Sequence, residues 1–198
     1  ELSRKTEERQ MFEIELKFRV ANVSELRERL AENDAVLVSE NENQDTYYNH
    51  PSRDFAESGE ALRVRRIDGT PLVTYKGSKR PGAVKAREEL EWRLDPGDPT
   101  GESMETLFDR LGFRKVATVT KQRETFHLGS SNPMTVTIDR VEGLGEFAEI
   151  ERVLHERTPS DEAVEKARGE VMDLASELGL KSPESRSYLR MQLELASG

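Results

Sequence analysis

The sequence predicts an α+β protein in which about eight strands form a mainly antiparallel β-barrel and helices pack against its outside. Apolar and polar residues alternate with period two in several segments, which is typical of strands. Hairpin signals join neighbouring segments, which favours antiparallel pairing. The charged positions share one parity, and a barrel with a hydrated interior accommodates such a face. Residues 13–19 show the alternation most clearly, with Ile14, Leu16 and Phe18 on one face and charges on the other.

Turn signals divide the chain into the segments that we expect to be strands. The sequence Asp68-Gly69 is a strong two-residue hairpin signal, and residues 96–99, Pro-Gly-Asp-Pro, interrupt the chain. Residues 77–82 predict a flexible loop between two strands. The expected strand segments are residues 11–20, 36–38, 45–48, 61–67, 72–77, 84–94, 114–128, 134–142 and 146–154.

Helices are predicted where apolar residues recur every three or four positions between capping signals. Ser24 is the candidate N-cap of a helix over residues 23–30, and residues 55–60 form either a loop or a short helical turn. Gly112 and Gly179 stand where two further helices end. These two helices cover residues 102–111 and 160–178, and a last helix over residues 187–195 is expected to dock on the barrel.

Length and composition indicate a single domain. The chain has 198 residues, and we assign the domain to residues 11–198 and an N-terminal extension or expression remnant to the polar residues 1–10. The absence of cysteine excludes disulfides, thiolate zinc sites and cysteine nucleophiles. No apolar run approaches the ~18 residues of a membrane span. No signal-peptide segment is recognisable, so we expect a cytoplasmic protein without a membrane partner.

The charge balance is strongly acidic. The formal net charge is −9, from 39 acidic and 30 basic residues. Because nucleic-acid binding needs a basic surface, this balance argues against a nucleic-acid partner. Nine of the bases are lysine and 21 are arginine. A salt-adapted protein and a GC-rich genome would each give this pattern, and the sequence leaves both explanations open.

One interior face of the predicted barrel would collect charges of both signs. Isolated ions in an apolar core cost several kcal/mol each, so this face predicts a hydrated lumen. The apolar residues of opposite parity would then face the covering helices. The interior set comprises the acids Glu13, Glu15, Glu89, Asp139, Glu149 and Glu151 and the bases Lys17, Arg63, Arg65, Lys76, Arg87, Lys121 and Arg123.

This combination predicts a site for a metal-bound phosphate compound. Carboxylates are hard oxygen ligands for Mg²⁺ or Mn²⁺, whereas arginine and lysine bind phosphate oxygens. The three histidines lack metal-ligand spacing and are expected to be structural or exposed. The residues also allow less specific interpretations, namely Arg63 and Arg65 on a solvated hairpin, Glu89 on a solvated face, and Asp139 paired with Arg140.

Several segments together resemble a known family. Residues 13–20, EIELKFRV, resemble the ExExK opening motif of the CYTH superfamily, the triphosphate tunnel metalloenzymes. The segments RVR, KAREELE, TKQRETF, TIDRVEGLGEFAEIE and RSYLRM follow in that family's order, and the resemblance runs from about residue 11 to residue 195. The block GLGEFAEIE, with KQR and RSY, is most similar to the class IV adenylyl cyclase branch. The resemblance implies an eight-stranded antiparallel barrel that encloses a tunnel for a triphosphate.

The resemblance also implies roles for the interior residues, with Mg²⁺ or Mn²⁺ as the cofactor. The metal would be held by Glu13, Glu15, Glu149 and Glu151, with Asp139 and Glu89 carried over beside them. The triphosphate would be bound by Lys17, Arg63, Arg65, Lys76, Lys121 and Arg123, with Arg87 carried over. The groups closest to the chemistry would be Glu13, Glu15, Lys17 and Glu151.

The implied activity is an adenylyl cyclase that converts ATP to cyclic AMP and pyrophosphate. Divalent cations would activate the ribose 3′-hydroxyl and neutralise the leaving pyrophosphate. The same charges would serve a triphosphatase acting on nucleoside, thiamine or inorganic triphosphate, and this alternative stays open. A non-catalytic polyphosphate-binding module is a third interpretation, although pure polyanion binding needs bases more than carboxylates. The sequence also leaves open whether the protein forms a homodimer.

Overall fold

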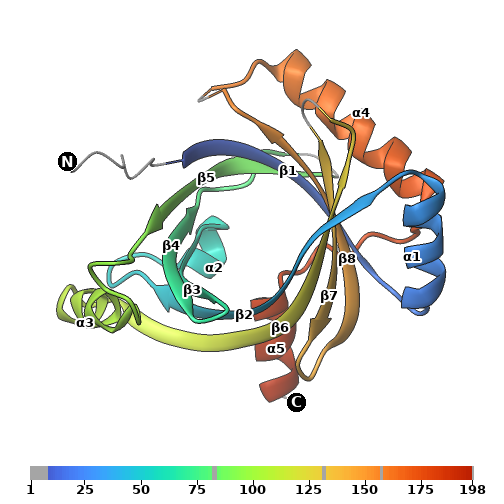
Figure 1. Ribbon diagram of the computed structural model, residues 1–198. Coiled ribbons are helices and arrows are strands. Elements are labelled where there is room, and N and C mark those ends of the chain that lie inside the picture. Colours follow the sequence, from blue (N-terminus) through green and yellow to red (C-terminus); the bar gives the residue numbers. More distant parts are fainter. Residues whose placement is uncertain (1–8, 82–83, 131–132, 157, 198) are drawn as a thin grey trace, which may run out of the picture.

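The protein is described by a computed structural model that covers residues 9–81, 84–130, 133–156 and 158–197. Its strands are β1 (Arg9–Arg19), β2 (Val36–Asn49), β3 (Ala61–Ile67), β4 (Thr70–Lys76), β5 (Lys85–Arg93), β6 (Arg114–Leu128), β7 (Met134–Val141) and β8 (Gly145–Leu154). They close into one barrel in the order β1-β5-β4-β3-β2-β6-β7-β8 (Figure 1). Every neighbouring pair is antiparallel. The predicted fold class is therefore confirmed.

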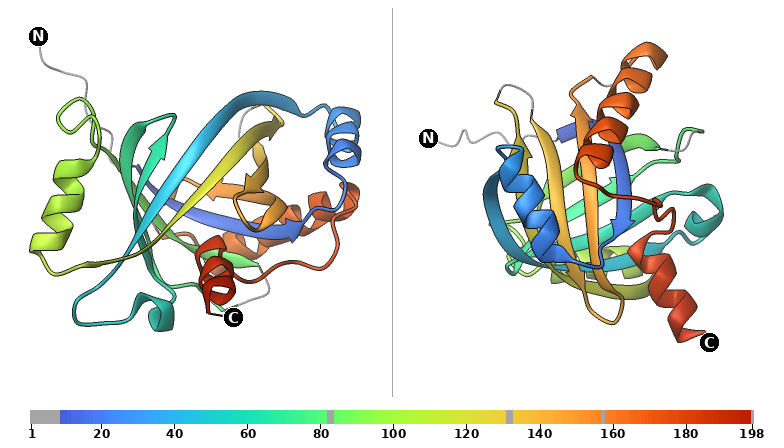
Figure 2. Two further views of the ribbon diagram at one scale, coloured as in Figure 1. Left: turned by 90° about the horizontal axis from the view of Figure 1, so that it is seen from below. Right: turned by 90° about the vertical axis from the view of Figure 1, so that its right-hand side faces the viewer.

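The helices lie outside the strands. They are α1 (Val23–Glu32), α2 (Phe55–Ser58), α3 (Glu102–Arg110), α4 (Asp161–Glu177) and α5 (Tyr188–Ala196). Helices α1 and α4 lie on one side of the barrel, and α3 lies on the opposite side (Figure 2). Across the described residues, no helix is long and apolar enough to span a membrane.

One predicted helix cap is wrong and another is confirmed. The N-cap of α1 is Asn22, whose backbone is extended and whose side chain accepts a hydrogen bond from the backbone N–H of Glu25. Ser24 instead lies inside the first turn, so the helix begins before the position that its hydroxyl would cap. Ser160 caps α4 as predicted, because its hydroxyl accepts from the backbone N–H of Ala163.

Two strand predictions are also corrected. Segments 36–38 and 45–48 are parts of the single strand β2, which stays paired with β6 across two register irregularities. Such bulges let a long strand bend without losing its partner. Residues 1–8 of the predicted N-terminal extension lie outside the described residues, whereas its last two residues belong to β1. Residues 55–58 form the short helix α2, as one of the two alternatives predicted.

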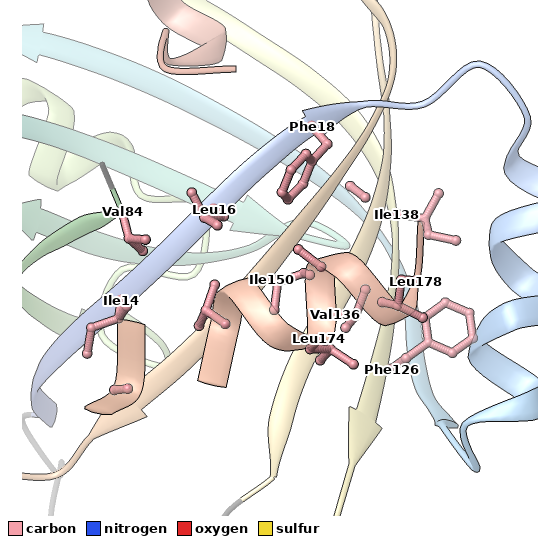
Figure 3. Packing of buried hydrophobic residues seen from close by; sticks show 14 of the residues in the cluster. Ile14, Leu16, Phe18, Val84, Phe126, Val136, Ile138, Ile150, Leu174 and Leu178 are labelled. Carbon is pink, nitrogen blue, oxygen red and sulfur yellow. The ribbon is translucent and has the colours of Figure 1, made fainter. Parts of the chain in front are cut away.

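The main apolar core lies between the outer face of the barrel and helices α1 and α4 (Figure 3). Ile14, Leu16 and Phe18 of β1 pack in this cluster with Leu174 of α4 and Leu178 beyond it. A second cluster lies between the barrel and helices α2 and α3. The apolar parity of the strands therefore faces the helices, as predicted, and leaves the other parity for the interior.

Candidate active site in the barrel interior

The interior face carries the acids and bases that the alternation predicts. Their contacts reach strands that are not hydrogen-bonded neighbours, such as β4 to β1 and β6 to β8, which only a concave inner face allows. The buried members are Glu13, Glu15, Lys17, Arg63, Arg65, Lys76, Glu89, Lys121 and Asp139. The half-buried members are Arg87, Arg123, Glu149 and Glu151.

The first group of contacts surrounds Lys76 at the end of β4. Its Nζ donates to Glu13 and lies 2.8 Å from Oε2 of Glu89. Burial opposes ionisation of Glu89, but the Lys76 charge and a hydrogen bond from Glu13 lower the pKa of Glu89 to about 2. Burial and the Glu89 charge raise the pKa of Glu13 well above its ordinary value. Within this carboxyl pair, Glu13 therefore has the higher pKa.

A second group joins β1 to β8. Glu15 lies opposite Glu151 and Lys17 lies opposite Glu149 in the strand register. Lys85 of β5 donates to Glu15 at 2.9 Å, and Lys17 Nζ lies 3.7 Å from Glu149 Oε1. Burial, followed by the charges of Glu89 and Glu15, raises the pKa of Glu151 to about 7. Carboxylates are thus crowded where β1 and β8 meet.

The third group converges on Asp139 of β7, which is fully buried. Its carboxylate accepts from Lys121 at 2.9 Å, from Arg123 Nε at 2.6 Å and from the Tyr188 hydroxyl at 2.9 Å. Burial opposes its charge, but Arg123 and Lys121 hold the pKa of Asp139 well below its ordinary value. Burial and the Arg123 charge lower the pKa of Lys121 to about 8. The Arg123 guanidinium also bonds Glu149 at 2.5 Å.

Asp45 of β2 holds two arginines of β3. Arg65 donates to Asp45 through Nε at 2.6 Å and through Nη2 at 2.7 Å, and Arg63 donates at 3.3 Å. This bidentate geometry fixes the plane of the Arg65 guanidinium. Burial raises the pKa of Asp45, but the two arginines outweigh burial and hold it well below its ordinary value. The carboxylate therefore orients the arginine pair inside the barrel.

Three residues of this network were missing from the predicted site. Asp45 lies on the same strand face as Tyr47, and Lys85 has the parity of Arg87, so alternation within their strands was the available signal. The third residue is Tyr188 at the start of α5, where no strand alternation marks it. Its ring stacks edge-on against Phe147 at 5.1 Å, but it also lies 4.0 Å from Lys17 Nζ.

Helix α5 closes one end of the charged interior. Tyr188 and Met191 of this helix pack against an apolar cluster formed by inward residues of four strands. These inward residues are Tyr47 of β2, Val119 of β6, Val141 of β7 and Phe147 of β8. A ligand bound to the charged groups would therefore meet apolar side chains at the end of the barrel that α5 covers.

The less specific interpretations do not match the structure. Arg140 pairs with Glu146 at 3.0 Å on the exposed side, and Asp139 faces the interior instead. Arg63, Arg65 and Glu89 are buried and not solvated. His50 packs against Phe55 and Phe113, His127 is half-buried, and His155 is exposed, as the absence of metal-ligand spacing predicts.

The donor chemistry of the interior suits a divalent cation. In the described part of the chain, no three acidic or histidine side chains are already placed so that together they could hold a metal ion. Even so, Glu15, Glu149 and Glu151 offer hard carboxylate oxygens on two adjacent strands. Burial, with the charges of Glu89 and Glu15, raises the pKa of Glu151, and a bound cation would favour its ionised form.

Comparison with known proteins supports one family. A family model described as the CYTH domain matches residues 11–188. A protein of Methanocaldococcus jannaschii, described as a candidate adenylate cyclase, is 32% identical over 184 residues, which cover 92% of this chain and 99% of that protein. Adenylate cyclase CyaB of Aeromonas hydrophila is 31% identical over 182 residues, which cover 89% of this chain and 86% of that protein.

Solved structures agree with this assignment. The PH1819 protein of Pyrococcus horikoshii has a TM-score of 0.80 and 36% identity, and the match covers 92% of this chain and 99% of that chain. A structure from Hippeastrum, described as a candidate adenylyl cyclase with a dominant triphosphatase activity, has a TM-score of 0.61 at 19% identity over 90% of this chain and 93% of that chain. That distant likeness shows the fold alone. From the family model and the relatives above 30% identity, the chain belongs to the CYTH domain family.

Proposed function

We propose that this protein is a metal-dependent adenylyl cyclase that converts ATP to cyclic AMP and pyrophosphate inside the barrel. The observation that carries the proposal is the interior itself, where carboxylates and cationic side chains from all eight strands interleave in one buried space. Two relatives above 30% identity are described as adenylate cyclases, one of them as a candidate. The interior charges suit a metal-bound triphosphate, and the descriptions of the relatives favour ATP as the substrate.

The cationic side chains would bind the phosphates. Asp45 orients the Arg63 and Arg65 pair, and Asp139 orients Lys121 and Arg123. Because these carboxylates fix the guanidinium planes in advance, little side-chain entropy is lost when phosphate binds. Lys17, Lys76 and Arg87 add positive charge from β1, β4 and β5, and we assign them to the same task.

The carboxylates would hold Mg²⁺ or Mn²⁺. We assign Glu13, Glu15, Glu149 and Glu151 to this role. Glu89 and Asp139 would assist by orienting the lysine side chains that they contact. When bound, the cation neutralises phosphate charge and acidifies the attacking hydroxyl. Lys17 and Arg123 contact Glu149 and would stabilise charge that develops on the α-phosphate and on the leaving pyrophosphate.

A triphosphatase is the second candidate. The same side chains would bind the phosphates if water attacked the terminal phosphorus in place of the ribose hydroxyl. The structure from Hippeastrum, with the same fold, is described as having a dominant triphosphatase activity. A non-catalytic module for polyphosphate is the third candidate, and the many buried carboxylates weigh against it.

Product analysis separates these activities. The protein is incubated with ATP or with inorganic triphosphate, in Mg²⁺ and in Mn²⁺, and the products are resolved by chromatography. We expect cyclic AMP and pyrophosphate from ATP, with inorganic triphosphate a poor substrate. Glu15→Gln and Glu151→Gln should abolish turnover without unfolding the protein, because each removes a metal-binding charge. Orthophosphate without cyclic AMP would favour the triphosphatase, and binding without any product would favour the binding module.

A further inference from the structure

A row of hydroxyl side chains lies next to the charged groups of the interior. Thr137 of β7 stands opposite Glu149 of β8 and opposite Thr125 of β6, and Thr125 stands opposite Ser39 of β2. Directly opposite residues of an antiparallel pair share one face of the sheet. Because Glu149 belongs to the interior, Thr137, Thr125 and Ser39 line the interior as well.

The direction of Thr137 is confirmed by its neighbours in β7. Val136 and Ile138 lie in the apolar cluster on the outer face of the barrel (Figure 3). Successive residues of a strand point to opposite faces, so the Thr137 side chain points inward. Inside, it is 3% exposed, and its hydroxyl oxygen has no hydrogen-bond partner. A buried polar atom without a partner is costly, and a ligand in the lumen would supply the missing hydrogen bond.

The row is neutral where its surroundings are charged. Two residues along β6 from Thr125, on the same face, Arg123 stands between Asn41 and Asp139. Phosphate oxygens would bind the Arg123 guanidinium, so the hydroxyl row suits the uncharged part of the ligand. Neighbouring side chains across an antiparallel sheet are on the order of 5 Å apart, so a row of three hydroxyls extends over about 10 Å, which is wide enough to lie along a ribose ring and its substituents.

Exposure along the row indicates where it leads. Thr137 is buried, whereas Thr125 and Ser39 are half-buried. Residues 36–38, which precede Ser39 in β2, are exposed. The row therefore runs from the metal-binding carboxylates toward solvent, as a triphosphate-linked sugar would if its base lay near the opening.

We propose that Ser39, Thr125 and Thr137 form a subsite for the ribose of a nucleoside triphosphate, with the Thr137 hydroxyl bonded to a ribose hydroxyl. The proposal rests on the proposed function, since it names the part of the substrate that an inorganic triphosphate lacks. Thr137 would thus be a specificity-determining residue that favours nucleotides over bare triphosphate.

The test compares wild type with Thr137→Val, which replaces the hydroxyl by a methyl group. Binding is measured by calorimetry at 4 °C with Mg²⁺ for ATP, 2′-deoxy-ATP, 3′-deoxy-ATP and inorganic triphosphate, with chromatography to verify that no product forms. We expect the variant to bind ATP roughly fivefold more weakly and inorganic triphosphate equally well. One of the two deoxynucleotides should bind wild type and variant alike, because it lacks the hydroxyl that Thr137 contacts.

Two further variants serve as controls for this test. Thr137→Ser retains the hydroxyl and should restore ATP binding. Thr46→Val removes a hydroxyl that is equally buried but faces outward, where it pairs with Thr118 at 3.3 Å. This variant should therefore change neither the affinity for ATP nor the affinity for inorganic triphosphate. Equal weakening of ATP and inorganic triphosphate, or unchanged ATP binding, would overturn the ribose subsite and leave the triphosphate site standing. Failure of wild type to bind either ligand would overturn the proposed function, and the subsite with it.

Discussion

At the scale of single residues, Glu151 shows how burial and neighbouring charges in the interior raise the pKa of a carboxyl group. It lies opposite Glu15, and burial with the charges of Glu89 and Glu15 raises its pKa to about 7. The ordinary glutamate pKa is 4.5. Between these two values the folded protein keeps a proton that the unfolded chain releases. The contribution of Glu151 to the free energy of unfolding therefore decreases as pH rises from about 4.5 to about 7.

Replacement of Glu151 by glutamine should remove this pH dependence. We expect Glu151→Gln to gain stability relative to wild type as pH rises through that window, and the difference should level off above pH 7. Urea unfolding at several pH values, without divalent cations, gives the free energy of unfolding of both proteins and hence this difference. A difference between variant and wild type that stays constant with pH would contradict the raised pKa of Glu151.

The arginine side chains should carry much of the triphosphate affinity. A charge-assisted hydrogen bond is worth ~1.5–3 kcal/mol, so Arg65→Ala and Arg123→Ala should each weaken triphosphate binding by roughly tenfold or more. Calorimetry with inorganic triphosphate and with a nucleoside monophosphate tests this. Arg140→Ala is the matched control, because Arg140 is exposed and pairs with Glu146 on the outside. Equal affinity of the wild type for triphosphate and monophosphate would refute the arginine assignment.

At the scale of elements, helix α5 connects the end of the chain to Lys17 and Lys121, the lysines to which we assign phosphate binding. The Tyr188 ring lies 4.0 Å from Lys17 Nζ and 4.9 Å from Lys121 Nζ, and its hydroxyl donates to Asp139. A cation over an aromatic ring gains ~0.5–2 kcal/mol. Asp139 retains two cationic partners without the tyrosine hydroxyl. We therefore expect the Tyr188 ring to contribute more to triphosphate affinity than its hydroxyl does.

Two substitutions at Tyr188 separate these contributions. Tyr188→Phe keeps the ring and should leave triphosphate affinity within about twofold, whereas Tyr188→Leu should weaken it by up to about tenfold. Thermal melting establishes whether each variant is folded, and calorimetry then gives the affinity. If both variants weaken binding to the same extent, the hydroxyl and not the ring positions the lysines.

The elements also show where sequence patterns lose information. The alternation predicted most strands closely, and β3 and β6 have the bounds expected. Strand β2 was divided into two segments because residues 39–44 between them are all polar and show no apolar alternation. The N-cap of α1 was assigned to the wrong residue because Asn22 and Ser24 are both good caps, and only the backbone conformation decides between them.

At the scale of the whole molecule, the net charge of −9 should make stability depend on salt. The interior charges are extensively paired, so the excess of acids lies on the surface. Surface repulsion destabilises the compact state and is screened by salt. We expect the melting temperature to rise with KCl well beyond physiological concentration if the surface is salt-adapted. A flat or falling trend up to molar KCl would favour the composition of a GC-rich genome as the explanation.

The sequence by itself determined which residues share a face. Successive side chains of a strand point to opposite sides, so the alternation over residues 13–19 places Glu13, Glu15 and Lys17 together whatever the rest of the chain does. The same local rule gave the inward parity of the arginines and lysines on later strands. The hairpin signal Asp68-Gly69 likewise determined that β3 and β4 pair as antiparallel neighbours, because a two-residue turn permits no other pairing.

Only the tertiary structure decided which of these residues meet. Lys76 bonds Glu13 because β4 lies two strands from β1 in the closed barrel, and no local pattern encodes that neighbourhood. Alternation places Asp45 and Thr137 on the interior face, but their roles depend on the residues placed opposite and around them. Strand order and register are set by closure of the barrel and by packing of its outer face against helices distant in sequence.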